Sequence, residues 1–114
     1  MPSQFVMGTI QFRPIGCYYA GASPNLLPTF LSNLRTNIDW NNLQSTIEAC
    51  ATITNNSGYK YFGIEFWGEC WVSMDFDSTS SNLVPGASCE IECYNGVAAA
   101  NRMFVYEILV FAAQ

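Results

Sequence analysis

The segment from Tyr59 to Trp71 constrains the fold of this chain more than any other part of the sequence. It holds six aromatic side chains, with Gly63 and Gly68 spaced among them. Aromatic side chains favour strands, and glycine permits a sharp turn or a close approach of two backbones. The segment therefore predicts two strands joined by a turn that form part of a core, rather than a catalytic loop.

Length and composition indicate one globular domain, residues 1–114, because no linker or internal repeat divides the chain. Half of the 114 residues are apolar and only 11% are charged, which excludes a disordered chain. No apolar run approaches the roughly 20 residues that a helix needs to cross a bilayer. We therefore expect no membrane insertion.

The charge balance argues against nucleic acid as a partner. The net charge is −5, from nine acidic residues against four basic ones: Arg13, Arg35, Lys60 and Arg102. Four scattered cations cannot form a stripe that follows a phosphate backbone. The acidity mainly favours solubility.

Periodicity along the chain predicts strands at both ends and one good helix between them. Alternation over Gln4 to Ile15 predicts an N-terminal strand that ends at Pro14 and Gly16. Four apolar residues then recur at helical spacing for a turn or two: Leu27, Phe30, Leu31 and Leu34. Ser45 and Glu48 form a capping box that predicts the start of the clearest helix, which Asn55-Asn56-Ser57-Gly58 ends.

The last strand is expected over Arg102 to Phe111. Together these elements predict an α+β fold in which a twisted antiparallel sheet packs on one main helix, stabilised by disulfides. Pairing of the first and last strands would bring the two ends of the domain together. A long apolar strand with an unpaired edge would also favour self-association into homo-oligomers.

The titratable residues give no recognisable catalytic machinery. The chain has no histidine, so a Ser-His or Cys-His dyad is impossible. Glu65 and Glu69 form one of three carboxylate pairs, but with Ile64 and Phe66 pointing inward on a strand, Glu65 would point outward. Nothing fixes two carboxyls across a cleft, as a glycosidase requires. We expect no enzyme and no cofactor.

Five cysteines without histidine favour a disulfide framework over a zinc site. An odd number leaves one thiol unpaired or intermolecular. The polar loop from Asp75 to Asn82 offers oxygen ligands for calcium but lacks the spacing of an EF-hand. No metal site is therefore predicted, although a calcium requirement is left open.

Aromatic residues beside polar loops are the candidate binding residues. Trp67 would face away from Phe66 on a strand, and Trp40 and Tyr94 lie in or beside loops. Such rings suit the apolar face of a sugar, whose hydroxyls would bond to Asp75, Asp77 and Asn82. The same rings could instead cover the sheet or a subunit interface. Two functions follow: a lectin-like module that binds carbohydrate, or a structural or adhesive module that binds other chains or itself.

Several short motifs resemble a known extracellular module. They are Gly16-Cys17-Tyr18, Leu27-Pro28, Arg35, Ile38-Asp39-Trp40, Ile47-Glu48-Ala49-Cys50, Gly58 to Ile64, Gly68-Glu69-Cys70-Trp71, Asn95-Gly96-Val97 and Phe104-Val105-Tyr106. The set resembles a small secreted module of marine invertebrate proteins, similar in turn to WSC and PAN/apple domains, over about residues 15–108. The block Tyr61 to Trp71 is its most specific part.

The resemblance implies a cysteine-bridged α+β fold that is secreted and binds carbohydrate or extracellular proteins without catalysis. A full WSC domain carries two further cysteines, at the positions of Thr54 and Val72 in this chain. Their joint loss is expected if those two positions pair with each other. Cys50 then pairs with Cys70, and Cys17 pairs with Cys93, with Cys89 as the alternative partner.

Overall fold

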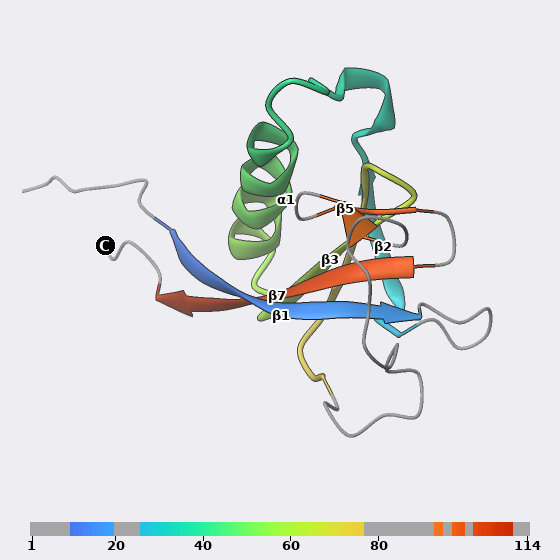
Figure 1. The fold of residues 1–114 in the computed structure, drawn as a ribbon. Coiled ribbons are helices and arrows are strands. Elements are labelled where there is room, and N and C mark those ends of the chain that lie inside the picture. The colour runs from blue at the N-terminus through green and yellow to red at the C-terminus, as the bar shows by residue number, and fades with distance from the viewer. Residues whose placement is uncertain (1–9, 20–25, 77–92, 95–96, 100–101, 111–114) are drawn as a thin grey trace, which may run out of the picture.

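The computed structural model describes residues 10–19, 26–76, 93–94, 97–99 and 102–110. Figure 1 shows one helix packed on a twisted sheet, which confirms the α+β prediction. The elements, in chain order, are β1 (Gln11–Tyr19), β2 (Thr29–Asn33), the 3-10 helix η1 (Arg35–Asn37), α1 (Gln44–Asn56), β3 (Tyr61–Glu65), β4 (Glu69–Ser73), β5 (Cys93–Tyr94), β6 (Val97–Ala98) and β7 (Arg102–Val110).

Five strands form an antiparallel sheet in the order β1-β7-β3-β4-β2, and β5 pairs with β6 in a separate ribbon. The first and last strands of the sheet pair as predicted, with Gln11 opposite Val110 and Tyr19 opposite Arg102. Because β3 pairs with the other side of β7, the last strand is internal to the sheet. The expectation of an unpaired edge on this strand was therefore wrong.

Two predicted boundaries differ from the structure. β1 continues through Pro14 to Tyr19, with a register shift between Pro14 and Gly16. An edge strand accommodates proline because the missing N–H can face outward. The apolar residues that suggested a short helix after Leu27 instead lie in and beside β2, which pairs with β4 at the opposite edge.

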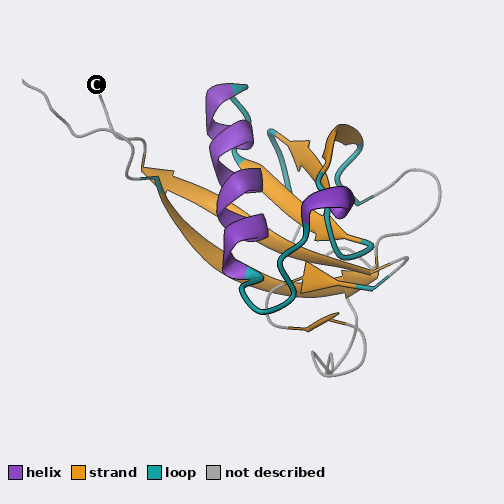
Figure 2. Cartoon of the chain, turned by 90° about the horizontal axis from the view of Figure 1, so that it is seen from above, coloured by secondary structure: helices purple, strands orange, loops and turns teal. Residues whose placement is uncertain are grey.

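Helix α1 lies over one face of the sheet, as Figure 2 shows. It begins at Gln44, one residue earlier than expected, and Leu43 is its N-cap without a side-chain hydrogen bond. The predicted capping box is absent, because the Ser45 hydroxyl donates to the carbonyl oxygen of Asn42. The helix ends as predicted: Gly58 follows it with a φ of 82°, a left-handed conformation that glycine adopts at low cost.

The sheet separates two apolar clusters, because neighbouring residues of a strand point to opposite faces. The larger cluster joins α1 to the sheet: Leu43, Ile47, Cys50, Ala51, Phe62, Ile64, Cys70, Val72, Val97, Tyr106 and Ile108. The smaller cluster, on the other face, consists of Tyr18, Leu27, Met103 and Val105. Gly63 lies on this second face, where a Cβ atom would collide with the Met103 side chain.

A disulfide between Cys50 and Cys70 ties α1 to β4, as predicted, with 5.6 Å between the Cα atoms. Cys17 is also disulfide-bonded. Its predicted partner Cys93 and the alternative Cys89 have side chains outside the described residues, so the choice between them stays a prediction. No helix in the described part of the chain is both long and apolar enough to span a membrane.

Candidate functional site

The hairpin between β3 and β4 turns through two aromatic residues. Phe66 and Trp67 have φ angles of 51° and 72°, and the Gly68 N–H donates to the Glu65 carbonyl oxygen at 3.2 Å. Two consecutive left-handed residues define a type I′ turn, in which Asn-Gly is the preferred pair. A bulky side chain in this conformation costs roughly 1–2 kcal/mol. The predicted alternation of Phe66 and Trp67 across a strand was therefore wrong.

Backbone contacts from two other segments hold this turn in place. The N–H groups of Phe66 and Trp67 donate to the carbonyl oxygens of Ala99 and Ala98, at 3.3 and 2.6 Å. On the other side, the Leu34 N–H donates to the Gly68 carbonyl oxygen at 2.8 Å. These bonds hold the backbone of both aromatic residues.

Each ring of the turn packs on a side chain from the segment between β2 and α1. Trp67 makes an edge-to-face contact with Trp40, with 5.7 Å between ring centroids. The guanidinium carbon of Arg35 lies 3.6 Å from the centroid of the Phe66 ring. Trp67 is half-buried against the helix-side core, whereas Trp40 is 58% exposed. We call Arg35, Trp40, Phe66 and Trp67 the aromatic tip.

Exposed polar residues precede and follow Trp40 in the sequence. Asp39 and Asn41 flank it directly, and an Asp39 carboxylate oxygen accepts a hydrogen bond from the Asn41 N–H at 3.0 Å. The Asn33 side-chain oxygen accepts from the Arg35 N–H at 3.0 Å. These bonds shape the loop, in which Asn41 and Asn42 are exposed.

The structure brings together part of the predicted binding set. Trp40 and Trp67, which are 27 positions apart in sequence, are in direct contact. The backbone of Tyr94 lies in β5, opposite Val97 of β6, the strand that accepts a hydrogen bond from the aromatic turn. The side chain of Tyr94 is outside the described residues. Asp75 is exposed beyond the end of β4 that is remote from the turn. Asp77 and Asn82 lie outside the described residues.

A second aromatic surface was not predicted from the sequence. Phe30 of β2 is 48% exposed and contacts Trp71 of β4 edge-to-face, with 5.2 Å between centroids. The Trp71 indole N–H donates to Glu69 at 3.2 Å. The sequence does not predict this contact, because Phe30 lies opposite Trp71 only if residues 29–33 form a strand.

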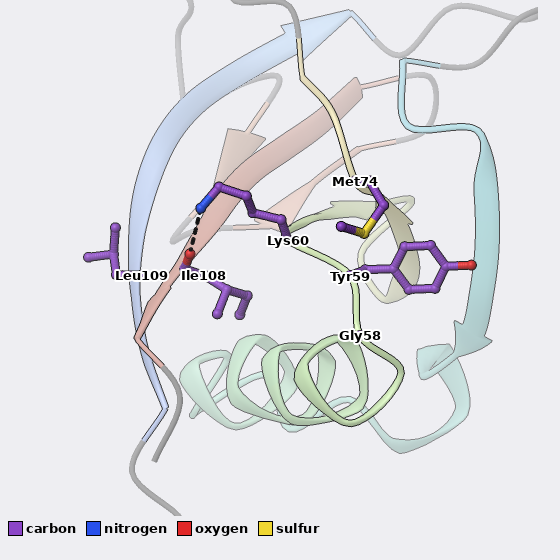
Figure 3. Close-up of a pocket in the computed structure, with 6 residues that line it drawn as sticks. All are labelled: Gly58, Tyr59, Lys60, Met74, Ile108 and Leu109. Carbon is purple, nitrogen blue, oxygen red and sulfur yellow. Dashed lines mark hydrogen bonds between the residues drawn. The ribbon is translucent and has the colours of Figure 1, made fainter. Parts of the chain in front are cut away.

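A hollow of about 320 Å³ lies at the start of β3, remote from the aromatic tip (Figure 3). Its lining is mainly apolar: Gly58, Tyr59, Lys60, Met74, Ile108 and Leu109. The Lys60 ammonium donates to the Ile108 carbonyl oxygen at 3.4 Å, as the dashed line in Figure 3 marks. The hollow thus lacks a pair of facing carboxylates or a row of donors.

The structure changes the expected placement of one carboxylate and pairs another with two cations. Glu65 is buried, contrary to the expectation that it points outward, and lies opposite Glu69 in the strand register. Glu107 forms ion pairs with Arg13 at 2.8 Å and Lys60 at 3.1 Å. The hydrogen bond from Lys60, followed by that from Arg13, lowers the pKa of the Glu107 carboxyl despite partial desolvation. No group of three potential metal-binding side chains occurs within the described ranges.

Comparison with protein families gives one match, the WSC domain, over residues 15–100. The chain belongs to the WSC domain family. The matched segment contains Cys50 and Cys70, the aromatic tip and the ribbon that holds it. No curated protein and no solved structure matches the chain. The similarity to PAN/apple domains and to marine invertebrate proteins stays a prediction.

WSC domains are extracellular or cell-wall-associated modules of the carbohydrate-binding type. The membership therefore supports the broad class of function predicted from the sequence. The family membership does not identify which residues of this WSC domain contact a ligand.

Proposed function

We propose that this protein is a non-catalytic, secreted, lectin-like WSC module that binds carbohydrate at the aromatic tip. Its ligands are extracellular glycans, and it needs no cofactor. The observation that carries the proposal is the contact between exposed Trp40 and half-buried Trp67. One ring is anchored in the core and the other presents its surface to solvent.

This arrangement has the chemistry of a sugar site. The C–H groups on one face of a pyranose ring pack on an aromatic face, while its hydroxyls need hydrogen-bonding partners at the edge. Trp40 supplies the ring surface, and its exposed neighbours in the sequence, Asp39, Asn41 and Asn42, supply carboxylate and amide groups. The predicted contributions of Tyr94, Asp75, Asp77 and Asn82 remain part of the proposal.

The strained turn supports the choice of this site over the second aromatic surface. Residues in sparsely populated backbone conformations cluster at binding sites, where the surrounding structure holds them. Phe66 and Trp67 occupy left-handed positions that Asn-Gly would fill more cheaply. Retaining two large rings there is consistent with a role for the rings themselves.

Substitution of Trp40 by Ala, compared with Phe30→Ala, tests the proposal. Both variants remove an exposed ring that contacts a tryptophan edge-to-face, so each controls for the other. We expect Trp40→Ala to weaken glycan binding at least about tenfold, which corresponds to 1.4 kcal/mol, and Phe30→Ala to leave binding unchanged. Glycan-array screening followed by titration of the best ligand measures both.

Thermal unfolding of the same variants separates binding from stability. An exposed ring contributes about 1 kcal/mol or less, whereas truncation of a buried tryptophan costs roughly 3–5 kcal/mol. Loss of binding in Phe30→Ala alone would show that the ligand binds at the Phe30 and Trp71 surface instead. Retention of binding in both variants would show that neither ring is needed and would favour the Asp75 to Asn82 loop as the site.

The alternative function is a structural or adhesive module that associates with itself or other chains. The observation in its favour is Phe30, exposed on the edge strand β2. Edge strands can pair with another chain, and an exposed ring on one adds apolar contact area. Sedimentation velocity tests this function: concentration-dependent oligomers that Phe30→Ala abolishes, together with no glycan signal, would replace the lectin proposal.

A further inference from the structure

We propose that the aromatic tip selects sugars that carry an anionic group, a carboxylate or a sulfate, and that Arg35 binds this group. The inference rests on the proposed function, because it places Arg35 beside the surface that receives the sugar ring. It adds a class of ligand that neither the family nor the aromatic rings alone specify.

The stacking of Arg35 on Phe66 prepares its guanidinium for an anion. With the guanidinium carbon 3.6 Å from the ring centroid, the side chain is held in one orientation by the cation–π contact. The N–H groups of a guanidinium lie in its plane, so stacking on one face leaves them able to donate. This planar fork matches the oxygens of a carboxylate or sulfate and forms two parallel hydrogen bonds.

Arg35 and the tryptophans are fixed to the same turn. Phe66 and Trp67 are consecutive, so the side chains that contact their rings, Arg35 and Trp40, flank one short stretch of backbone. The backbone of Arg35 also packs on Gly68, where an added Cβ would lie 3.0 Å from the Arg35 nitrogen. A sugar ring on Trp40 would thus lie near a positioned cation.

The charges of the described residues leave Arg35 available for a ligand. Arg13 and Lys60 both pair with Glu107 at the other end of the sheet. Arg35 is exposed and forms no ion pair with any carboxylate in the described part of the chain. An exposed guanidinium, oriented by an aromatic ring but without a carboxylate partner, has the properties of an anion-binding group.

The acidic residues on the same segments, Asp39, Glu65 and Glu69, form no ion pair with Arg35 in the described part of the chain. An Asp39 oxygen accepts a hydrogen bond from the Asn41 N–H, and Glu69 accepts one from the Trp71 indole. The net charge of −5 repels anions at long range. At physiological salt this repulsion is screened over about 8 Å, so the local contact with Arg35 decides binding.

Matched saccharides and charge variants test the inference. The probes are trigalacturonate, its neutral counterpart trigalactose, and trigalactose carrying sulfate. The variants are Arg35→Gln, which removes the charge, and Arg35→Lys, which keeps the charge but loses the fork. Arg13→Gln changes the net charge equally at a remote exposed position and serves as the control.

We expect the wild-type protein to bind one or both acidic saccharides more tightly than trigalactose, with an affinity that falls as salt is raised. Arg35→Gln should weaken acidic binding about tenfold or more and leave neutral binding unchanged. Arg35→Lys should give an intermediate loss, whereas Arg13→Gln should change affinity less than about twofold. The preference between trigalacturonate and the sulfated probe identifies the anionic group.

Equal affinity for acidic and neutral saccharides, or equal losses in Arg35→Gln and Arg13→Gln, would overturn the role of Arg35. If Trp40→Ala still abolished binding in that case, the proposed function would stand without this inference. If none of the probes or arrayed glycans bound to the wild-type protein, the inference and the proposed function would both fall. Thermal unfolding of the Arg35 variants confirms that the turn is intact.

Discussion

The hydroxyl oxygen of Thr54 lies 4.0 Å from the sulfur of Cys70. Thr54 is fully buried and donates to the Cys50 carbonyl oxygen one helical turn earlier. The end of α1 is held over this part of the sheet, because the Tyr59 N–H bonds to the Thr54 carbonyl oxygen and the Lys60 N–H to that of Ser73. The four residues from Cys50 to Thr54 rise about 6 Å along the helix, and the two residues from Cys70 to Val72 rise about 6.6 Å along the strand, so Thr54 should lie beside Val72.

A disulfide moved to these two positions should replace the natural one. Cys50→Ala with Cys70→Val should lower the free energy of unfolding by about 3 kcal/mol on the chain-entropy model. Adding Thr54→Cys and Val72→Cys in that background closes a loop of nearly the same length and should restore most of the loss. Chemical denaturation gives the stability, and non-reducing peptide mapping identifies the bond.

Thr54→Cys alone in the same background is the control, because it adds a buried thiol without a partner and should restore nothing. Free thiols at both positions of the four-site variant, under oxidising conditions, would show that Thr54 and Val72 are not adjacent.

An alanine variant is usually more stable than the glycine variant at the same position, and the backbone conformation of Trp67 should reverse this order of stability. Trp67→Ala and Trp67→Gly lose the same ring, but only glycine adopts a φ of 72° without a steric cost. We expect Trp67→Gly to be more stable than Trp67→Ala by about 1 kcal/mol. Denaturant unfolding of both variants measures the difference in the free energy of unfolding. The control is the pair Trp40→Ala and Trp40→Gly at an exposed position. A less stable glycine variant at position 67 would contradict the left-handed turn.

The local elements of this fold could be predicted from the sequence, because their signals lie within a few residues. The hairpin follows from aromatic residues and glycines, and the end of α1 from Gly58. The spacing of Leu27, Phe30, Leu31 and Leu34 predicts a helix where the structure has β2, because a short apolar run does not distinguish a helix from a strand. Only the pairing of β2 with β4, a long-range contact, decides between them.

Only part of the candidate site can be predicted from the sequence, and the structure groups those residues for a reason other than the one the sequence suggests. The sequence predicts Trp67 as an exposed ring on a strand and Trp40 as a ring beside a loop, but their contact depends on a turn type that two bulky residues do not signal. The sequence does not indicate a role for Arg35 at the site, because its contact with Phe66 joins residues 31 positions apart. Glu65 was expected to point outward on alternation alone, whereas it is buried next to the turn.

Gly63 should not tolerate a side chain without a change in Met103. An added Cβ would collide with the Met103 side chain and lie 3.1 Å from a Leu27 methyl carbon, and both residues are fully buried. Gly63→Ala should therefore lower the free energy of unfolding by roughly 1–3 kcal/mol. Combining it with Met103→Val should recover part of this loss. Additive losses in the double variant, measured by denaturant unfolding, would show that the two side chains do not compete for space.

Glu107 should make stability depend on pH. Its pKa is lowered in the folded state, chiefly by the hydrogen bond from Lys60, so the unfolded state takes up a proton first as the pH falls. The sign follows from this linkage: the stabilisation is present above the unfolded pKa of about 4.3 and is lost as the pH falls through the lower folded value. Because Arg13 and Lys60 are largely exposed, we expect less than about 1 kcal/mol from each pair.

The free energy of unfolding of wild type and Glu107→Gln, measured between pH 7 and pH 3, tests this dependence. The wild type should be more stable at pH 7, and the difference should shrink as the pH falls below about 4.3, where both proteins carry a neutral side chain at this position. Glu48→Gln, at an exposed position on α1, is the matched control for the loss of one carboxylate. A difference between wild type and Glu107→Gln that is independent of pH would mean that Glu107 stabilises the fold by packing rather than by its charge.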